Sequence, residues 1–525
     1  MSKARCLDSM NEDILILIFS RLGVPDLLSV RQACQRLNKI TRLRFVWYNA
    51  CVFNILRPGY PFPDVPLDDL TEFDLERYTR LAHRLSLRWS SRSSLGSQHR
   101  AQSPAAFDSF PLTRERSFKA STSTEITAVR FLHGRKERYL LAVSKGIWST
   151  LSLWRIDGPG GNKSQNAAAP HECTKWSPKG ALFSKFVLNK DVKSEGVIAL
   201  SVFMAGFTIV LTLEGIETAG SDVEFKVLST IDTTLEPMEM RGNIIAFADE
   251  SSQTVIFNRR TGLSGLLQHE QEQGVFLHDP CVQVVFAYHS VLVVRARSLH
   301  LFPWPELLAP DVIQPTRSVG HHSFGWVDGI SAVLPAQKFN EHSDNTLGNK
   351  PIMILSRTPS HDPWSSDVCT LDLYKLEPNP AFVPPTTNDA APGLWNAAPG
   401  ATSPYIFPPL RTAQADSRRG PIRCLDIMLG KYGTAMWLHP RDSATHGLVS
   451  LNTHLQEIPL QSTPWSDERL VAAVLSGPLD RVAQDDMVTT IARNVDNDWT
   501  ALDYDEGMGR VAIGSSFGKL TIMEL

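Results

Sequence analysis

The chain has 525 residues, of which 42% are hydrophobic and 20% are charged, and its formal net charge at pH 7 is −3. This length exceeds what one hydrophobic core usually organises, so we expect a soluble globular protein with two or more domains. The slightly negative charge argues against attraction of the whole protein to nucleic acid or to an anionic membrane.

Residues 13–22 predict the first helix of the chain. Its apolar residues recur at spacings of one, three and four and form one broad face: Ile14, Leu15, Ile18, Phe19 and Leu22. Ile16 and Leu17 are apolar as well, and we expect Ser9 to cap the helix. A helix this short therefore has more apolar surface than its own small unit can cover.

Two further helices are predicted before residue 50. Gly23 ends the first helix, and Pro25 begins the second, over residues 26–31, because proline suits the first helical turn. The third, over residues 33–43, places Leu37 and Ile40 inward, and Trp47 is expected to fold back as a plug. Three helices in about forty residues form a core that is small to stand alone, which predicts a docking module for a partner helix.

This stretch resembles the F-box over residues 7–52. The resemblance rests on Met10, Asn11, Asp13, Ile14, Leu15, Ile18, Phe19, Leu22, Asp26, Leu27, Leu28, Cys34, Leu37 and Trp47. It implies docking onto the Skp adaptor of a cullin-based (SCF-type) ubiquitin ligase. The implied adaptor-binding residues are Met10, Asn11, Ile14, Leu15, Leu17, Ile18, Leu22, Leu27, Leu28, Cys34, Leu37 and Trp47.

The opening of the module departs from the family pattern. The family usually opens with Leu-Pro, and this chain has Met10 and Asn11 there. Asn11 lacks the proline ring that presets a helix start, a change that bears on adaptor affinity rather than on the fold. The alternative interpretation of the whole stretch is an N-terminal helical cap packed onto its own domain.

A linker is expected between the F-box (residues 1–56) and the body, over residues 57–117. Thr71 and Asp74 form a capping-box pattern before an amphipathic helix of about eighteen residues, whose apolar positions are Phe73, Tyr78, Leu81, Leu85 and Trp89. Arg80, Arg84 and Arg88 share one face. They indicate either a basic stripe for an acidic partner or nucleic acid, or a solvated outer face, which we favour. Residues 90–117 are rich in Ser and Arg and predict loop or disorder.

The body, residues 118–525, has the pattern of a β-propeller. Short β-rich runs recur in seven groups, and each group is a small antiparallel sheet that needs neighbours to bury both faces. Residues 151–156, 254–262 and 511–525 are similar to the last strands of WD-repeat blades, although the Gly-His and Trp-Asp signatures are out of register. Seven blades are predicted, with six or eight, or a pair of β-sandwiches, as alternatives. The last strand is expected to close the ring with one near residues 118–125.

Two segments interrupt the blade pattern. Residues 377–419 hold nine prolines and little apolar periodicity, so we expect a loop insertion there. Residues 336–350 predict a shorter one. The expected fold class is thus α+β and multidomain, with a small three-helix F-box, a helical linker and a large all-β propeller.

Three patterns that suggest an enzyme are better explained as structure. Residues 514–518 match G-x-S-x-G but lack a following helix, so they predict a hairpin turn. Residues 158–164 lack the spacing of a phosphate-binding loop. His321 and His322 show no metal-like pairing with carboxylates. We therefore predict no catalytic residue, no cofactor and no metal.

The remaining signals concern location. The seven cysteines are far apart and form no C-x-x-C pair, which predicts reduced thiols. The charged opening around Lys3 and Arg5 argues against a secretory signal, and no run of about 18 apolar residues predicts a membrane span. A cytoplasmic or nuclear location is expected.

The predicted function follows from the two unlike halves. The head would dock a Skp-type adaptor and through it a cullin, while the propeller would bind a target protein for ubiquitination and degradation. The first alternative is a scaffold or regulatory protein that binds the adaptor outside a cullin ligase, and the second is a hydrolase built on a propeller. Propeller specificity depends on loops, so the sequence does not identify the target.

Overall fold

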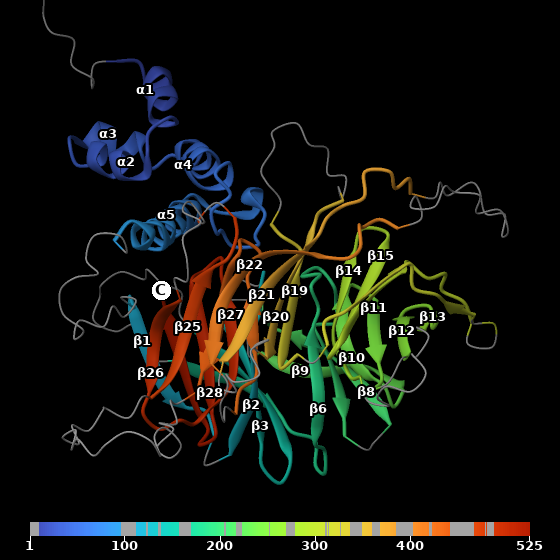
Figure 1. The fold of residues 1–525 in the computed structure, drawn as a ribbon. Helices are drawn as coiled ribbons and strands as arrows, with labels where there is room; N and C mark the ends of the chain where they lie inside the picture. Colours follow the sequence, from blue (N-terminus) through green and yellow to red (C-terminus); the bar gives the residue numbers. More distant parts are fainter. Residues whose placement is uncertain are drawn as a thin grey trace, which may run out of the picture.

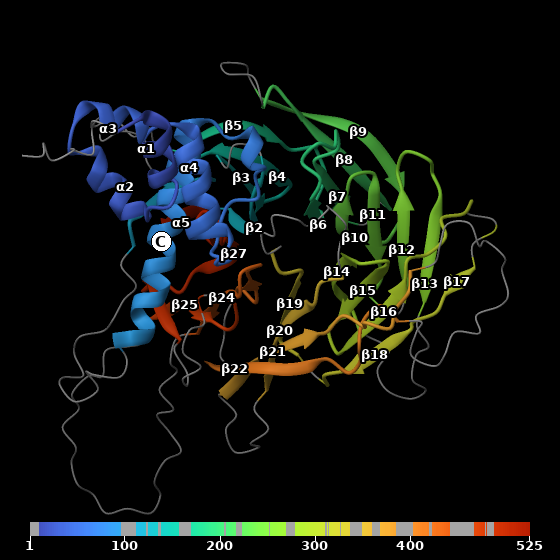
Figure 2. The same ribbon diagram turned by 90° about the horizontal axis from the view of Figure 1, so that it is seen from above.

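The structure, a computed structural model, describes residues 10–95, 112–121, 124–134, 138–156, 170–203, 206–216, 223–250, 253–268, 279–309, 312, 314–325, 327–336, 349–359, 368–384, 403–418, 423–440, 467–477, 479 and 488–525. A helical head lies at one end of a ring of seven β-sheets (Figure 1). Viewed from above, the sheets surround a common axis and the head covers one side of the ring (Figure 2). No helix within the described ranges is long and apolar enough to cross a membrane.

The head contains four short α-helices where the sequence predicted three. They are α1 (Glu12–Phe19), α2 (Val24–Arg31), α3 (Gln35–Ile40) and α4 (Arg44–Cys51), followed by the π-helix η2 (Val52–Leu56). The expected third helix stops early because Thr41 bonds back to the Asn38 carbonyl at 3.0 Å and the chain turns there. Trp47 therefore lies within α4, fully buried, and is not a plug that follows the third helix.

The start of α1 also differs from the prediction. The N-cap is Asn11, whose side chain accepts a hydrogen bond from the Asp13 amide at 3.4 Å. Ser9, the expected cap, lies outside the described residues. Asn11 has φ −60° and ψ 143°, the extended conformation usual at an N-cap. A polar cap thus replaces the proline that the family pattern has here.

The linker helix is longer than predicted. After the short 3-10 helix η3 (Leu67–Asp69), α5 spans Glu72–Leu95. Its capping box is confirmed, because the Asp74 amide donates to Thr71 Oγ1 at 3.2 Å. The predicted apolar residues are buried except Phe73, which is 67% exposed. Phe73 lies in the first turn of the helix, before the helix reaches the propeller.

The predicted stripe of arginines on α5 is divided between two environments. Arg80 and Arg84 are exposed, and Arg80 forms an ion pair with Glu76 at 3.2 Å. Arg88 is half-buried, and its Nη1 donates to Thr113 Oγ1 at 2.6 Å. The favoured solvated-face interpretation therefore fits the first two arginines, whereas the third fastens the helix to the segment that enters the propeller.

The seven sheets are the blades of a propeller, as predicted. In each, antiparallel strands follow one another outward from the axis. The first four sheets are β2 (Glu125–Phe131), β3 (Tyr139–Lys145), β4 (Ser149–Arg155) and β5 (His171–Trp176); β6 (Phe183–Leu188), β7 (Ile198–Val202), β8 (Phe207–Glu214) and β9 (Glu224–Asp232); β10 (Glu236–Arg241), β11 (Ile244–Ala248), β12 (Gln253–Asn258) and β13 (Ser264–Gln268), with β17 (Pro315–Thr316) added in parallel; and β14 (Cys281–Ala287), β15 (Ser290–Arg295), β16 (Ser298–Pro303) and β18 (Gly320–Ser323).

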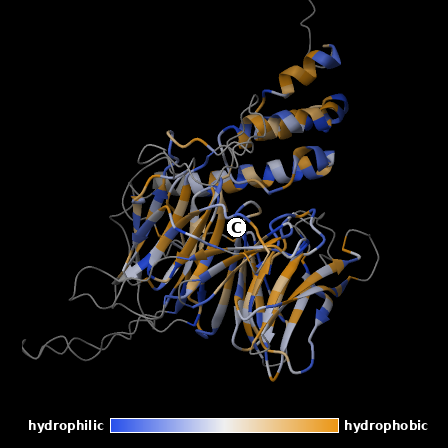
Figure 3. Ribbon diagram, turned by 90° about the vertical axis from the view of Figure 1, so that its right-hand side faces the viewer, coloured by the Kyte–Doolittle hydropathy of each residue, from blue (hydrophilic) through white to orange (hydrophobic). Residues whose placement is uncertain are grey.

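The other three sheets complete the ring. They are β19 (Gly329–Val333), β20 (Ile352–Pro359), β21 (Val368–Leu376) and β22 (Leu410–Arg418); β23 (Ile427–Leu429), β24 (Thr434–His439), β25 (Glu468–Val474) and β26 (Thr489–Asn494); and β27 (Trp499–Asp505), β28 (Arg510–Ser515) and β29 (Lys519–Glu524) with β1 (Arg114–Lys119). Apolar residues recur along these strands and along the helices of the head (Figure 3). Buried clusters of such residues fill the spaces between neighbouring sheets.

Ring closure joins distant parts of the chain, as the sequence predicted. Strand β1 pairs with β29 from Arg114↔Glu524 to Lys119↔Lys519, so one blade combines a strand that precedes the ring with the last three strands. An ion pair between Arg116 and Glu524 at 2.7 Å, both largely buried, supports this pairing. The closing strand spans residues 114–119 rather than 118–125. Its charged and half-buried side chains alternate as in an outer strand, and this weak hydrophobic pattern explains why the sequence did not locate it.

The expected Pro-rich insertion is shorter than predicted. Strand β22 lies inside residues 377–419 and pairs with β21 along nearly its whole length. As the outermost strand of its blade it needs only one apolar face, which explains why the segment lacks a strong hydrophobic pattern. Residues 385–402, which hold the middle of the expected insertion, lie outside the described residues.

The structure describes two of the three enzyme-like patterns. Residues 514–518 comprise the end of β28 and the turn at residues 516–518 that leads into β29, so the hairpin prediction is confirmed. His321 and His322 lie on the outer strand β18. Among the described residues no group of His, Cys, Asp and Glu could hold a metal ion. Residues 158–164 lie outside the described ranges.

Candidate adaptor-docking site

Helix α1 carries an apolar surface that the rest of the protein leaves uncovered. Ile14, Leu17 and Ile18 are 45%, 66% and 36% exposed. On the other side of the same helix, Leu15 and Phe19 are completely buried in the core of the head. The helix is thus apolar on both sides, and among the described residues only one side has a partner. This is the surplus that the sequence predicted.

The predicted adaptor-binding residues fall into three groups by exposure. Asn11, Ile14, Leu17 and Ile18 are exposed; Met10, Leu22, Leu28 and Cys34 are half-buried; and Leu15, Leu27, Leu37 and Trp47 are at most 4% exposed. The buried group packs the helices of the head against one another. Its members hold α1 in place, and the exposed group forms the candidate docking surface.

Polar contacts fix the orientation of α1. Arg36 Nη2 donates to the Met10 carbonyl at 2.8 Å, which ties the chain before α1 to α3. At the other end, the Ser20 hydroxyl donates to the Ile16 carbonyl at 2.7 Å and accepts from Asn49 Nδ2 of α4 at 3.3 Å. Both ends are therefore anchored, so the helix cannot rotate Leu17 inward without breaking these bonds.

One exposed apolar residue of the head was not predicted. Phe45, in the first turn of α4, is 56% exposed, while the adjacent Val46 and Trp47 are completely buried. A helix turns by about 100° per residue, so one of three consecutive apolar residues can face outward when the other two face the core. The predicted third helix ended at residue 43 and no helix was predicted over residues 44–51, so this pattern was not recognised.

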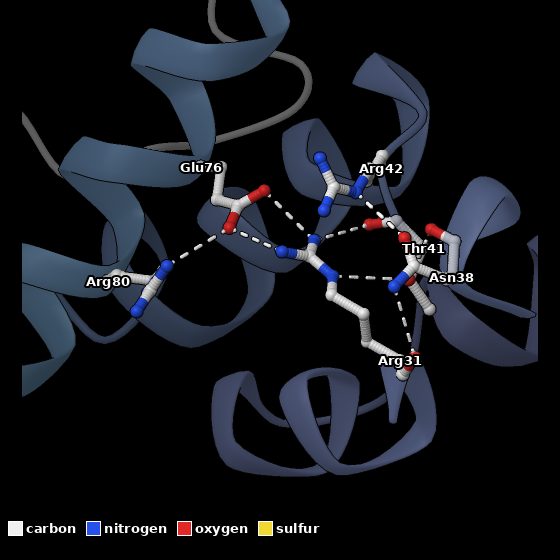
Figure 4. A network of polar contacts seen from close by, with 6 residues as sticks. All are labelled: Arg31, Asn38, Thr41, Arg42, Glu76 and Arg80. Atoms are coloured by element: carbon white, nitrogen blue, oxygen red, sulfur yellow. Dashed lines mark hydrogen bonds and ion pairs between the residues drawn. The ribbon is translucent and has the colours of Figure 1, made fainter. Parts of the chain in front are cut away.

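A polar network joins the head to α5 (Figure 4). Arg31, on α2, donates to both carboxylate oxygens of Glu76 on α5, at 2.6 and 2.9 Å. The same guanidinium donates to the Thr41 carbonyl at 3.1 Å, and Asn38 Nδ2 donates to the Arg31 carbonyl at 3.3 Å. Arg80 adds a second cation at 3.2 Å from Glu76. One arginine thus holds α2, the α3–α4 turn and α5 together.

The charges in this network lower the pKa of Glu76. Burial alone would raise it, but the hydrogen bonds and positive charges of Arg31, followed by those of Arg80, outweigh burial. Only 13% and 16% of the side chains of Arg31 and Glu76 are exposed, so solvent screens this pair less than it screens a surface ion pair. The network therefore stabilises the position of the head on α5.

The head and the propeller share one hydrophobic core. Leu75, Leu81 and Leu85 of α5 belong to the same buried cluster as Met508 and Val511 of the closing blade. A glycine makes the contact between α5 and the closing blade possible. A Cβ atom added to Gly509 would lie only 2.5 Å from the Leu85 side chain. Polar contacts accompany it, since the Tyr432 hydroxyl donates to the Phe62 carbonyl at 3.0 Å and Lys431 pairs with Asp64. The docking surface is thus held at a fixed place on the ring.

Comparison with known proteins identifies the head. The model of the F-box-like family matches residues 12–52. No curated protein sequence matches the chain. Among solved structures, a chain in the crystal structure of a mitotic checkpoint complex is similar over 81% of this chain and 95% of its own length, at 9% identity and a TM-score of 0.40. Residues 12–52 thus form an F-box-like domain, which is followed in this chain by a seven-bladed β-propeller.

Proposed function

We propose that this protein is the substrate-recognition subunit of an SCF-type (Skp–cullin–F-box) ubiquitin ligase. The F-box-like domain docks the Skp-type adaptor and through it the cullin, and the propeller binds a target protein for ubiquitination and degradation. The protein itself performs no catalysis in this role, and it acts in the cytoplasm or the nucleus. The observation that carries the proposal is the exposed apolar surface of Ile14, Leu17 and Ile18 on a domain of the F-box-like family.

The physical argument is the cost of leaving that surface in water. Burying an apolar side chain contributes about 1.5–3 kcal/mol, so a helix of the adaptor that covers these three residues gains a substantial part of its binding free energy there. Asn11 lies beside them at the exposed start of α1. Leu17 is the most exposed of the three and is expected to be the centre of the contact.

Leu17→Asp tests the proposal. The change would bury an unpaired carboxylate at the interface, and we expect affinity for the adaptor to fall at least about thirtyfold, which corresponds to about 2 kcal/mol. Phe73→Asp is the matched control, because Phe73 on α5 is 67% exposed and Leu17 is 66% exposed. Adaptor binding by purified full-length variants is the measurement, with circular dichroism to verify folding.

The same experiment separates the receptor from its alternative. Co-purification of the cullin together with the adaptor supports a ligase receptor, whereas adaptor without cullin supports a scaffold or regulatory protein that acts outside a cullin ligase. Retention of full adaptor affinity in Leu17→Asp would contradict the proposed docking surface altogether.

A further inference from the structure

The face of the ring opposite the head carries a second apolar surface. The turn between β27 and β28 holds Gly507 and Gly509 against Phe62 and Leu85, so it lies on the head side. Strand β28 runs away from that turn, which places residues 516–518 at the opposite end (Figure 1). The β3–β4 turn lies at this end as well, because Lys145 at the end of β3 pairs with Glu125 at the start of β2, directly after the β1–β2 turn.

Four large apolar side chains project from three neighbouring blades at this end. They are Phe517 (66% exposed), Ile147 (83%), Trp148 (44%) and Phe203 (57%), which we call the apolar row. Phe517 lies in the β28–β29 turn, Ile147 and Trp148 lie in the β3–β4 turn, and Phe203 follows β7. Monomeric proteins seldom expose several large apolar residues side by side without a binding role.

Close contacts show that the turns carrying the row are adjacent. Thr124 lies between the first two turns and close to a glycine in each. A Cβ atom added to Gly518 would lie 3.0 Å from the carbonyl oxygen of Thr124, and one added to Gly146 would lie 3.1 Å from the methyl group of Thr124. Trp148 lies 4.0 Å from the place that a Cβ on Gly180 would occupy. The row therefore continues from the closing blade to the blade of β2–β5 and onto the β5–β6 turn.

The β5–β6 turn then connects Trp148 to Phe203. The Phe203 amide donates to the Leu182 carbonyl at 2.6 Å. The same turn is fastened to β4, since the Ser149 amide donates to the Ala181 carbonyl at 2.9 Å. Ser177 Oγ also donates to the Ser149 carbonyl at 2.9 Å. Because hydrogen bonds hold these turns, the surface is already formed before any partner arrives, which reduces the entropy cost of binding.

The charges beside the row are mainly positive. Lys119, Lys145, Lys179 and Lys519 are exposed in or next to the same turns, and the acidic residue among these segments is Glu125. The whole chain has a net charge of −3, so this concentration of lysines is local. The acidic side chain of Asp496 is exposed on the far side of Phe517. It lies in the turn before β27, which is held next to Phe517 because the Ser516 amide donates to the Asp498 carbonyl at 2.8 Å. Lys145 and Lys179 thus lie next to Ile147 and Trp148, and Lys119 and Lys519 lie next to Phe517.

We propose that the apolar row is where the target binds, and that it takes an acidic peptide segment with large apolar side chains. This inference rests on the proposed receptor function and specifies its target surface. The apolar side chains of the peptide pack on Ile147, Trp148 and Phe517, and its carboxylates lie beside Lys145 and Lys179. A nucleic acid or an anionic membrane fits less well, because the lysines accompany a row of exposed apolar residues and a nearby acidic side chain, Asp496.

The test is a random peptide library displayed on phage and selected against the purified full-length protein. Selected peptides are expected to be acidic and to contain aromatic or branched aliphatic residues. Their affinity is then measured for the double variants Ile147→Ser/Phe517→Ser and Lys145→Glu/Lys179→Glu. In each variant we expect a roughly tenfold or greater loss, which corresponds to about 1.4 kcal/mol.

Matched controls come from the opposite face. Val383→Ser removes an apolar side chain that is 76% exposed, and Lys193→Glu reverses an exposed lysine in the β6–β7 turn on the head side. Both should bind the selected peptides like the unaltered protein. No enriched peptide, or peptides whose affinity is insensitive to both double variants, would overturn the inference.

Two further outcomes distinguish the possible failures. Strong binding of duplex oligonucleotide or phosphatidylserine vesicles that depends on Lys145 and Lys179 but not on Ile147 and Phe517 would indicate a general polyanion surface and would overturn the inference. The adaptor is assayed in the same preparation: adaptor binding without peptide binding removes this inference alone, whereas peptide binding without adaptor binding removes the proposed ligase function and leaves the surface.

Discussion

Leu15 and Leu17 lie two positions apart on α1 and have opposite environments. Leu15 is completely buried, whereas Leu17 is 66% exposed. Helical geometry separates residues two apart by about 200°, so an apolar residue at each of these positions gives the helix two apolar sides. One side forms the core of the head, and the other is available to a second protein. The docking proposal depends on this division.

Asn11 shows how the chain departs from the family pattern without losing its helix start. Its φ of −60° suits proline, but its side chain caps the Asp13 amide. We expect Asn11→Ala to lower the free energy of unfolding by about 0.5 kcal/mol, the low end for a lost cap, since the bond is long and exposed. Asn11→Pro loses the same cap but gains about 0.4–1 kcal/mol by restricting the unfolded chain.

Urea unfolding of the two variants checks this expectation. Asn11→Pro should be more stable than Asn11→Ala and close to the unaltered protein. The reverse order would mean that the residue before the ring, Met10, cannot adopt the extended conformation that proline demands.

Glu506 is a buried carboxyl group in the closing blade. Its oxygens accept hydrogen bonds from the Tyr432 and Thr434 amides at 2.7 and 3.0 Å. Burial raises its pKa from 4.5 to about 7, against the opposing effect of these bonds. Because the folded state binds the proton more tightly, the stabilisation is complete below pH 4.5 and is lost as the pH rises towards 7.

The expected loss is about 2–4 kcal/mol across that pH range. Glu506→Gln cannot titrate, so the difference in unfolding free energy between it and the unaltered protein should vary with pH in this window and be constant above pH 8 or so. Denaturant unfolding at a series of pH values measures the difference. A difference that is independent of pH would show that Glu506 is ionised, with an ordinary pKa, in the folded protein.

At the scale of elements, α5 connects the head to the ring. Its link to the head is the pair of Arg31 and Glu76, which is mostly buried and bidentate. We expect Glu76→Ala to lower the free energy of unfolding by about 2–3 kcal/mol, because Arg31 is left without its partner. Arg80→Ala should cost about 0.3–0.5 kcal/mol, since Arg80 is 48% exposed and forms an i,i+4 pair.

A double-mutant cycle of Arg31→Ala and Glu76→Ala measures the pair itself, and Arg80→Ala is the control. The pKa of Glu76 is lowered in the folded protein, so its stabilisation is present above the unfolded pKa and is lost as the pH falls through the folded one. Additive effects of Arg31→Ala and Glu76→Ala would show that the two side chains do not interact energetically.

Hydrophobic periodicity predicted these elements best where the pattern of apolar residues along a segment is strong. The inner strands of the blades and the surplus face of α1 carry strong apolar patterns, and both were predicted. The outer strands β1 and β22 have one buried side at most, so the limits of β1 were placed wrongly and β22 was taken for part of a loop insertion. The turn at Thr41 depends on hydrogen bonds from Arg31 and to Asn38, which no periodicity expresses, and the fourth helix was therefore missed.

The apolar row was beyond sequence analysis for a different reason. The pair Ile147–Trp148 and the single Phe517 are far apart in the chain, and each lies within an otherwise polar turn. Only ring closure, through the pairing of β1 with β29, brings their turns to either side of Thr124. A tertiary contact of this kind has no local pattern.

For the whole molecule, the shared core implies that the head cannot be removed cleanly. Leu75, Leu81 and Leu85 belong to one buried cluster that also contains residues of the head and of the closing blade. Deleting residues 1–60 would expose the side of α5 that the head covers. A surface change such as Leu17→Asp is therefore the better way to separate adaptor docking from target binding.

Ring closure makes the propeller one cooperative unit, and removing β29 tests it. Without residues 519–525 the chain loses the ladder from Arg114↔Glu524 to Lys119↔Lys519, and it loses the Arg116–Glu524 ion pair. Both β1 and β28 then present unpaired edges, and the cluster that contains Leu520 and Ile522 opens to water. We expect the shortened chain to aggregate, since exposed strand edges and apolar surface both favour association.

The measurement is size-exclusion chromatography with light scattering, together with thermal unfolding. The matched control is the double variant Arg116→Ala/Glu524→Ala, which removes the ion pair but keeps the strand. It should remain monomeric, with a lower melting temperature and a single transition. Closure by strand pairing would be contradicted by a shortened chain that stays monomeric and unfolds in one cooperative step near the melting temperature of the full chain. In that case six blades would be sufficient to hold the ring, and β1 and β29 would only cover its edge.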